Sequence, residues 1–585
     1  MRAFPRALTA RCCGVLVALA IAVAPSAQTI THTDPQTKVD LCTIQVTPYA
    51  GSAAVGGLGF VHVQSKNQDR APHAMRVQFA SYSWVGNSVA AARTLALGPE
   101  ETGSFFLPLP SLGRYNFELQ VTVDSTTYVE NMVAPRRAGN AALLVTRSPS
   151  LEPMVLAMAQ SIWPTDKRVQ PVVLLCDVGQ TPDDWRLFTG FDLVVVDGFS
   201  PIPQTTQDAL RRCAHAGGHL LVIGPDRLPA GSLRRVVDDT AGTATVSYGL
   251  GAITVTPNLG VDPVAVRREL QLRMAGQSIW PLDHHVLDPQ PIPGLEQAPV
   301  LAFLLVILLF AVAAGPVNFH VLRKKRRPLL ALITVPALGL GTTLLMFGYA
   351  IVHDGFGVRG VVSSWTLLDQ RSHEGATIAA RTLFAGLSPG GFALGADSLL
   401  LAPGAFLSSD RRSRHRWSYD GDTDVIDGAV LPSRTTAALV TARQGVVRER
   451  LRAQVRADGD LDLLTDGGVV PVGEVLLRDL EGRYWFGQAP RLSPTAVGPA
   501  LAALQDLGRE LRRHELRDDT VGPGATMVVE LHGIGAALLG GDLPPGGYVA
   551  TVRQAPWLSE HGVEVDYERV RHQVVGRLAA EDFVR

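Results

Sequence analysis

Residues 298–353 have the sequence APVLAFLLVILLFAVAAGPVNFHVLRKKRRPLLALITVPALGLGTTLLMFGYAIVH, and no acidic residue occurs between Glu296 and Asp354. Apart from His320 and His353, its only bases form one cluster: Arg323, Lys324, Lys325, Arg326 and Arg327. Apolar runs flank this cluster over 298–322 and 329–353. About 20 apolar residues are enough to cross a hydrocarbon core of ~30 Å. The pattern therefore predicts two transmembrane helices joined by a short loop, 323–328.

The basic loop also predicts the orientation of this hairpin. Loops rich in Arg and Lys remain cytoplasmic, so the long segments on both sides are expected outside the cytoplasm. Residues 1–27 agree, because three arginines precede the apolar run 12–24 and small residues follow it. This is typical of a secretory signal peptide, cleaved or retained as a third anchor. We expect a protein of the bacterial cytoplasmic (inner) membrane with extracytoplasmic, periplasmic domains.

Length and charge narrow the classes of function. The chain has 585 residues and a formal net charge of −1, and this length favours about four domains. The signal and the basic loop contribute only positive charge to that total, so the remaining chain is acidic. Nucleic-acid binding needs a basic face and is not expected. The expected partners are the lipid bilayer and a membrane protein, with an envelope glycan as a further class.

Two domains are predicted before the membrane. Residues 28–138 contain short strands of alternating polarity, separated by breaks rich in Gly, Pro, Asn and Asp. About seven such strands predict an Ig-like β-sandwich. Over 139–262, apolar strands such as 172–176 alternate with helical segments, which predicts a flavodoxin-like or Rossmann-like α/β domain with a parallel sheet. Residues 263–297 are the predicted linker to the hairpin.

Beyond the hairpin, 354–585 returns to short strands, such as 359–369 and 376–384, and predicts a C-terminal β-rich extracytoplasmic domain. Leu501, Leu504 and Leu507 recur at helical spacing, so an amphipathic helix is expected near 495–517. The predicted fold class is a multidomain α+β membrane protein. Its parts are an N-terminal β-sandwich, a flavodoxin-like α/β domain, a two-helix transmembrane hairpin and a β-rich C-terminal domain.

The α/β domain is the natural place to look for catalysis, because open α/β sheets bind ligands at the carboxyl ends of their strands. Asp177 and Asp197 each follow an apolar strand and are weak catalytic candidates. Strand-end aspartates more commonly close turns. Within 139–262, no glycine-rich phosphate loop and no GxSxG elbow occurs, and Cys176 and Cys213 fall within a predicted strand and helix.

Metal binding has one weak candidate set. Asp420, Asp422 and Asp424 alternate along the chain, as do the first ligands of a calcium loop. The sixth position is Val425 instead of glycine, and no Glu closes a twelve-residue loop. A second cluster, 458–462, departs from the pattern in the same way. Exposed Asp-Gly turns are the default interpretation, and no metal or other cofactor is expected.

Two further features predict contacts. Residues 411–417, RRSRHRW, are interpreted as an exposed basic loop that is either solvated or in contact with an anionic envelope polymer or a partner. Small residues four apart, Ala311 with Gly315 and Ala337 with Gly341, allow close approach of helices. They serve either packing within the hairpin or recruitment of a partner helix.

The stretch from Asp184-Trp185 through Phe191-Asp192-Leu193-Val194-Val195-Val196 and on to Gly217-Gly218-His219-Leu220-Leu221-Val222-Ile223 resembles class I glutamine-amidotransferase-like domains. With the GPVN motif at 315–318 and the LRKKRRP motif at 322–328, the whole arrangement resembles a group of uncharacterised bacterial membrane proteins that carry such a domain outside the membrane. Amidotransferases of this class need a cysteine at an elbow, which this chain lacks. The resemblance therefore implies a fold kept without its activity.

These observations favour a non-enzymatic envelope protein, a scaffold or accessory subunit of a membrane complex that acts through its extracytoplasmic domains. Two alternatives remain open. One is a hydrolase that uses the strand-end carboxylates of the α/β domain. The other is a sensor that binds a sugar or a cell-wall fragment.

Overall fold

The computed structural model describes residues 27–584 except for 35, 38, 50–56, 83–87, 111–115, 134–137, 164–169, 238–241, 260–263, 265, 269, 271–291, 294, 296–299, 396, 402–413, 419–422, 429, 467–468, 500–542 and 559–562. Residues 1–26 of the predicted signal, most of the predicted linker and the larger part of the predicted amphipathic helix lie outside the described residues. Asp420 and Asp422 lie outside them as well.

Two sheets form the N-terminal sandwich. The four-stranded sheet has the order β1 (Gln28–Thr33), β2 (Asp40–Tyr49), β3 (Leu58–Asn67) and β6 (Thr102–Pro110). The facing sheet contains β5 (Ser88–Leu97), β4 (His73–Tyr82), β7 (Asn116–Val123) and β8 (Thr126–Val133). Ile44 and Val46 of β2 point inward and are fully buried, while Gln45 between them is exposed. This alternation builds the core of the sandwich.

The second sheet of the sandwich does not end with the predicted range 28–138. Three strands from beyond the hairpin complete it, in the order β17-β20-β19-β5. They are β17 (Phe392–Gly395), β20 (Thr423–Asp427) and β19 (Arg414–Ser418), and β19 pairs in parallel with β5. Trp417 of β19 is only 3% exposed. The interpretation of 411–417 as an exposed loop is therefore wrong for 414–417, because these residues join a sheet.

The α/β domain has a six-stranded sheet of order β10-β9-β11-β12-β14-β13. Five strands are parallel: β9 (Ala138–Val145), β10 (Gln170–Cys176), β11 (Leu193–Asp197), β12 (His219–Ile223) and β14 (Gly251–Thr256). The edge strand β13 (Ala244–Tyr248) is antiparallel to β14. In chain order the parallel strands run 2-1-3-4-5, the doubly wound order of flavodoxin. The helices α1 (Glu152–Ile162), α2 (Gln204–Ala216) and α3 (Ser232–Val237) connect them.

A twelve-stranded sheet forms most of the C-terminal region. From one edge, its first six strands are β18 (Ser398–Leu401), β21 (Thr436–Val446), β16 (Glu374–Ala385), β15 (Val358–Asp369), β28 (Val565–Arg577) and β27 (Gly547–Val552). The sheet continues through β24 (Pro471–Arg478), β25 (Tyr484–Gln488), β26 (Arg491–Thr495), β23 (Leu461–Asp466), β22 (Arg450–Val455) and β29 (Phe583–Val584). The parallel pairing of β15 with β28 joins the start of this region to the end of the chain.

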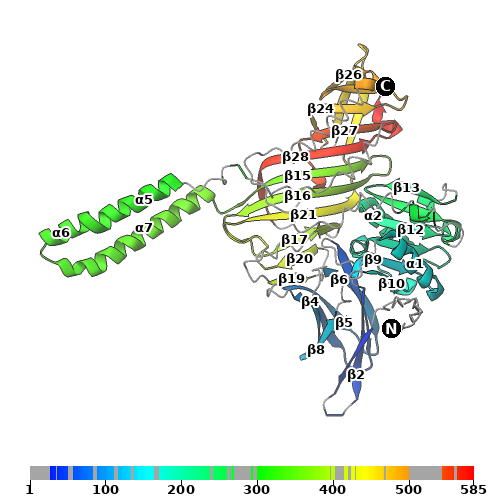
Figure 1. Ribbon diagram of the computed structural model, residues 1–585, viewed down its shortest axis with the longest axis horizontal. Helices are drawn as coiled ribbons and strands as arrows, with labels where there is room; N and C mark the ends of the chain where they lie inside the picture. Colours follow the sequence, from blue (N-terminus) through cyan, green and yellow to red (C-terminus); the bar gives the residue numbers. More distant parts are fainter. Residues whose placement is uncertain are drawn as a thin grey trace, which may run out of the picture.

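The predicted hairpin is present as two long apolar helices that project from the body (Figure 1). The first consists of α5 (Val300–Val312), a π-helical turn (Ala313–Val317) and α6 (Asn318–Lys324). The second, α7 (Ala331–Asp354), follows a short 3-10 turn (Pro328–Leu330). The spans Leu304–Lys324 and Pro328–Tyr349 are long and apolar enough to cross a membrane, and neither is buried in the protein.

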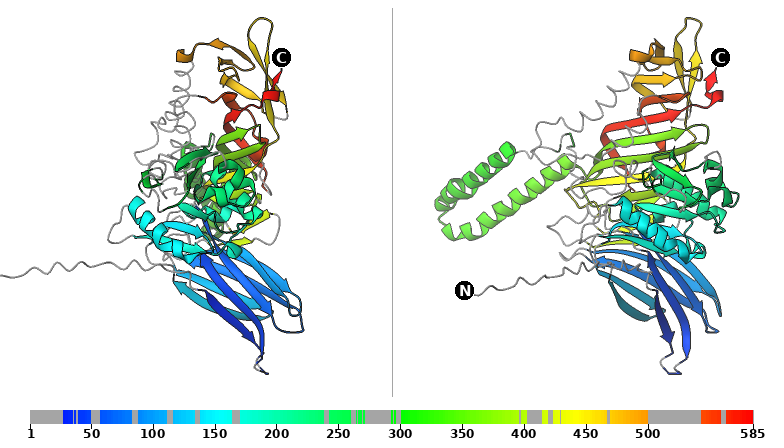
Figure 2. Two further views of the ribbon diagram at one scale, coloured as in Figure 1. Left: turned by 90° about the vertical axis from the view of Figure 1, so that its right-hand side faces the viewer. Right: turned by 45° about the vertical axis from the view of Figure 1, so that its right-hand side comes forward.

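The rest of the described chain forms one body. One hydrophobic core includes Phe60 of the sandwich, Val196 of the α/β domain and Val440 of the large sheet. The α/β domain packs beside this sheet, away from the hairpin, and the sandwich lies below both (Figures 1 and 2). Because segments on both sides of the hairpin share a sheet and a core, they lie on the same side of it.

Candidate functional site

The carboxyl edge of the α/β sheet is the first candidate site, since open α/β sheets bind ligands there, where the strand order reverses. β9 lies between β10 and β11, so the reversal occurs at the ends of β9 and β11. Thr146, Asp197 and Ser200 gather at this point. Each of them is buried.

Asp197 is held by hydrogen bonds at both carboxylate oxygens. Thr146 Oγ1 and Ser200 Oγ donate to Asp197 Oδ2 at 2.6 and 2.7 Å, and the Phe199 N–H donates to Oδ1 at 3.1 Å. The Arg147 N–H in turn donates to Ser200 Oγ at 3.0 Å. With 2% exposure, Asp197 ties the ends of β9 and β11 together. These are the contacts of a carboxylate that closes turns.

Asp177 lies on the other side of β9 and is exposed. It is the N-cap of a 3-10 turn (Val178–Gln180), where its side chain accepts the Gly179 N–H at 2.8 Å. One strand separates it from β11, so about 10 Å separates the two strand ends at ~4.8 Å per strand spacing. The structure therefore does not bring Asp177 and Asp197 together as a carboxylate pair on one reacting atom.

Phe199 is the exposed apolar group at this edge. Its side chain is 64% exposed, and its ring lies across the backbone of Gly224 at the end of β12. A Cβ on Gly224 would approach this ring to 2.7 Å, which is too close. Gly224 also has a φ of +60°, a conformation that favours glycine. The edge therefore presents an exposed aromatic ring near the buried Asp197.

The cysteines of the body are free and buried. Burial raises the pKa of Cys176 to about 12, although Thr181 and Tyr49 partly oppose this. Burial also raises the pKa of Cys213 to about 12. A catalytic thiol must ionise near neutral pH. Neither side chain is in the state that a cysteine nucleophile requires.

Buried ion pairs join the α/β domain to the strands beyond the hairpin, and sequence reasoning missed them. Arg186 contacts Asp184, two residues before it, and also Asp424 on β20. Asp424, one of the three metal candidates, is thus a partner of Arg186 in a buried contact between domains. Burial raises the pKa of Asp424 to about 6, against the opposing charge of Arg186.

A second ion pair links the same two regions. Arg211 on α2 donates to Glu374 Oε2 at 2.7 Å and approaches Oε1 at 2.6 Å. It also donates to the Tyr248 hydroxyl at 2.7 Å. Burial raises the pKa of Glu374, but its hydrogen bonds to Arg211 outweigh that effect and the net shift is downward. Glu374 begins β16, more than 160 residues after Arg211, so no local pattern could have indicated this contact.

Among the described residues, no group of three or more His, Cys, Asp or Glu side chains could hold a metal ion. In the acidic cluster 458–462, Arg456 pairs with Asp458 and Asp462 at 3.3 and 2.9 Å, and Ser493 donates to Asp460. These carboxylates serve a turn and its ion pairs. The clustered bases Arg323, Lys324, Lys325, Arg326 and Arg327 lie at the far tip of the hairpin, as predicted.

A polar contact joins the two helices of the hairpin. Asn318 Nδ2 donates to Thr334 Oγ1 at 2.9 Å, and Thr334 Oγ1 lies 3.0 Å from Asn318 Oδ1. Gly315 and Gly341 do not line this interface, since a Cβ added to either would meet nothing within 4 Å. These two glycines therefore do not serve close packing of the two helices against each other.

No model of a known protein family matches the chain, and no curated protein matches it. Among solved structures, it is similar to a cycloisomaltooligosaccharide glucanotransferase of Paenibacillus sp., complexed with cycloisomaltoheptaose, at 11% identity and a TM-score of 0.15 over 30% of this chain and 27% of that one. It is also similar to DesR, a β-glucosidase from Streptomyces venezuelae in complex with D-glucose, at 8% identity and a TM-score of 0.09 over 77% and 47%. The chain thus spans less than half the length of either, and scores this low carry no argument.

Proposed function

We propose that this protein is a non-enzymatic scaffold or accessory subunit of a membrane complex in the bacterial cytoplasmic membrane. The hairpin anchors it, with the basic loop 323–328 in the cytoplasm as the positive-inside rule requires. The body lies outside the cytoplasm. Its fold there includes an α/β domain similar to amidotransferases that has lost the catalytic cysteine.

One observation carries this proposal: strands before and after the hairpin belong to one sheet, through the parallel pairing of β5 with β19. Both ends of the hairpin therefore join the same folded body, and the hairpin anchors this whole body to the membrane. Asp424 and Glu374, whose pKa values are shifted, are both used to lock domains together. Such an arrangement suits a rigid platform for partners.

The hairpin offers a way to test for a membrane-protein partner. Gly341 lies four residues after Ala337 and faces open space, so Gly341→Leu should leave the hairpin intact while it blocks close approach of another helix. We expect a membrane protein to co-purify stoichiometrically with the full chain in mild detergent and to be lost from the Gly341→Leu variant.

Gly348→Leu is the matched control. Gly348 also faces open space, but Leu344 and Val352 lie four residues to either side of it, so it has no small-residue partner. Retention of the partner in both variants would indicate that the partner binds the body and not the hairpin. Recovery of the full chain without any stoichiometric partner would contradict the scaffold function.

The exposed Phe199 ring favours one second candidate, a sensor that binds a glycan at the carboxyl edge of the α/β sheet, since aromatic rings contribute large contact areas to binding sites. Phe199→Ala should then weaken binding of cell-wall fragments in calorimetry. The hydrolase alternative is tested best at Asp177, because it is exposed, and Asp177→Asn should not unfold the domain. Asp197→Asn is a poor test, since it breaks buried hydrogen bonds.

A further inference from the structure

One contact sets how closely the body approaches the membrane. The Arg434 guanidinium lies over the Phe347 ring, 5.2 Å from its centroid. Phe347 belongs to the span Pro328–Tyr349, whereas Arg434 belongs to the body, just before β21. If that span crosses the bilayer, Arg434 must lie at the level of the lipid headgroups.

The loop that carries Arg434 is joined to two others at the same end of the large sheet. The Arg434 N–H donates to the Ala385 carbonyl at 2.7 Å, and the Gly386 N–H donates to the Gly357 carbonyl at 3.0 Å. These bonds join the loops that carry Phe356, Leu387 and Arg434. Both apolar side chains are exposed, at 62% and 55%. The face next to the hairpin therefore exposes two large apolar side chains to its surroundings.

The chain is also held at this end on its way into the membrane. Ile292 is 2% exposed and packs against Val361 of β15 and Phe384 of β16. The first hairpin helix begins only eight residues later, at Val300. With both crossing segments attached to the same end of the sheet, the body has little freedom to move away from the bilayer.

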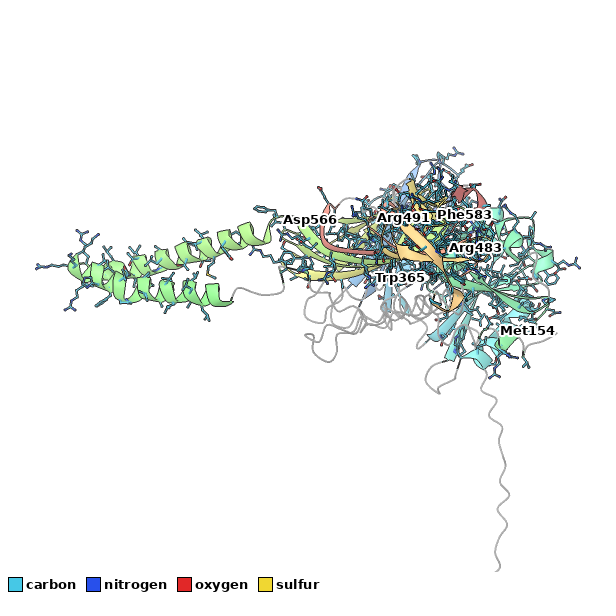
Figure 3. The ribbon with its side chains drawn as sticks, turned by 90° about the horizontal axis from the view of Figure 1, so that it is seen from above. Met154, Trp365, Arg483, Arg491, Asp566 and Phe583 are labelled. Carbon is cyan, nitrogen blue, oxygen red and sulfur yellow. The ribbon has the colours of Figure 1, made fainter. Side chains whose placement is uncertain are left out.

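The charges at this end are mixed. Arg359 and Arg434 are the bases, while Asp566 is the register partner of Arg359 on β28 and Glu564 precedes that strand. Figure 3 shows Asp566 at the end of the body nearest the hairpin and Met154 at the opposite end. Because the acids offset the bases, the apolar side chains, more than net charge, must supply the attraction to lipid. Arginine over an aromatic ring suits the level of the lipid phosphates.

We propose that this juxtamembrane face, formed by Phe356, Leu387, Arg359 and Arg434, docks on the leaflet from which the body emerges. Phe356 and Leu387 enter the region between the headgroups and the acyl chains, and Arg434 binds lipid phosphate beside Phe347. The proposal rests on the proposed membrane anchoring. It adds that the body lies against the bilayer in one fixed orientation, with the α/β domain facing away from it.

The test uses the full chain, with Cys12 and Cys13 replaced by serine, in vesicles of phosphatidylethanolamine and phosphatidylglycerol. Single cysteines replace Leu387, Leu340 or Met154 and are labelled with an environment-sensitive fluorophore. One set of vesicles carries quenchers on the lipid acyl chains near the headgroup. A second set carries them near the bilayer centre, the depth expected for Leu340 in the middle of its span. Leu340 lies within the second span and is 63% exposed, and Met154 is 39% exposed. The native Cys42, Cys176 and Cys213 are buried.

We expect the label at position 387 to be quenched several-fold more than the label at 154, and a Phe356→Asp change to reduce that quenching. Quenching at 340 without quenching at 387 would overturn the docked face while the anchor stands. A label at 340 that lipid quenchers do not reach would overturn the anchor itself. Protection of position 387 from both lipid quenchers and aqueous iodide would assign the face to a protein and also overturn the proposal.

Discussion

At the scale of single residues, Asp424 couples the fold to pH. Burial raises the pKa of its carboxyl to about 6, whereas aspartate in an unfolded chain titrates near pH 4. The folded protein therefore binds this proton more tightly than the unfolded chain. Asp424 stabilises the fold most at acid pH, and this contribution, about 3 kcal/mol for a shift of two pH units, is lost as the pH rises from about 4 to about 6.

Asp424→Asn should remove that dependence. The apparent Tm of the variant is expected to change less between pH 4 and pH 6 than that of the wild type, measured by thermal unfolding in detergent. At pH 7.5 the loss should be only about 1 kcal/mol, the net value of a hydrogen bond, because Arg186 keeps its contact with Asp184. Asp397→Asn is the control, since Asp397 pairs with Arg443 in a partly exposed position. Parallel pH profiles for wild type and Asp424→Asn would contradict this role.

Arg211 and Glu374 form a pair of the opposite kind, with both side chains 16% exposed and joined through two contacts. Arg211→Leu leaves the Glu374 carboxylate buried without its main partner and should destabilise the fold by about 3 kcal/mol. The double variant Arg211→Leu/Glu374→Leu should recover most of that loss, since no unpaired charge remains. Thermal unfolding of the two variants measures both values. A double variant as unstable as the single one would mean that packing, more than charge, matters here.

The two strand-end aspartates show what residue-level sequence reasoning can and cannot reach. Their positions after apolar strands were predictable, because a buried parallel strand is a continuous apolar run. Their partners were not: Thr146 and Ser200 reach Asp197 only once β9 and β11 are neighbours. Arg186 and Asp424 are separated by 238 positions, and no spacing rule relates residues so far apart.

At the scale of elements, Asn318 and Thr334 hold the hairpin together by their side chains. Asn318→Leu should weaken the association of the helices by about 0.6 kcal/mol, the average for hydrogen bonds between membrane helices, and by no more than about 1.7 kcal/mol. Energy transfer between labels on α6 and α7 reports when SDS separates the two helices. The SDS concentration at which they separate should be lower for the variant than for the wild type. Thr342→Val is the matched control, because the Thr342 hydroxyl bonds to the Leu338 carbonyl within its own helix. An equal fall in both variants would remove the special role of Asn318.

Elements with strong local patterns were predicted well, and elements defined by pairing were not. The strand predicted at 359–369 corresponds to β15, because alternating polarity reports a half-buried strand. β19 was interpreted as a loop because four of the seven residues at 411–417 are arginine. Pairing with β5 makes it a strand. Charged side chains are tolerated there where alternate residues face solvent, as the exposed Arg416 beside the buried Trp417 shows.

At the scale of the whole molecule, strands that lie far apart in the sequence share a sheet. The sheets therefore do not follow the order of the predicted domains. The sandwich takes β17, β19 and β20 from beyond the hairpin, and the α/β domain packs on β16 and β21, which also lie beyond it. Local sequence patterns predict consecutive domains. They could not indicate that strands from beyond the hairpin pair with strands from before it. The hairpin is thus an excursion from the middle of one body, and an N-terminal fragment ending before it would lack part of its own sheet.

This arrangement predicts that the hairpin loop can be cut without separating the protein. A protease site replacing Arg326 and Arg327 would yield two fragments, which should remain associated in mild detergent through the β5–β19 pairing, the shared core and the two buried ion pairs. An affinity tag on the C-terminal fragment should recover the N-terminal fragment in equal amount after cleavage, and both should elute together in gel filtration. Combining the cut with Arg186→Leu and Arg211→Leu should release part of the N-terminal fragment, because each change leaves a buried carboxylate unpaired. Separation of the fragments on cleavage alone would mean that the covalent loop, and not the shared sheet, holds the two halves of the body together.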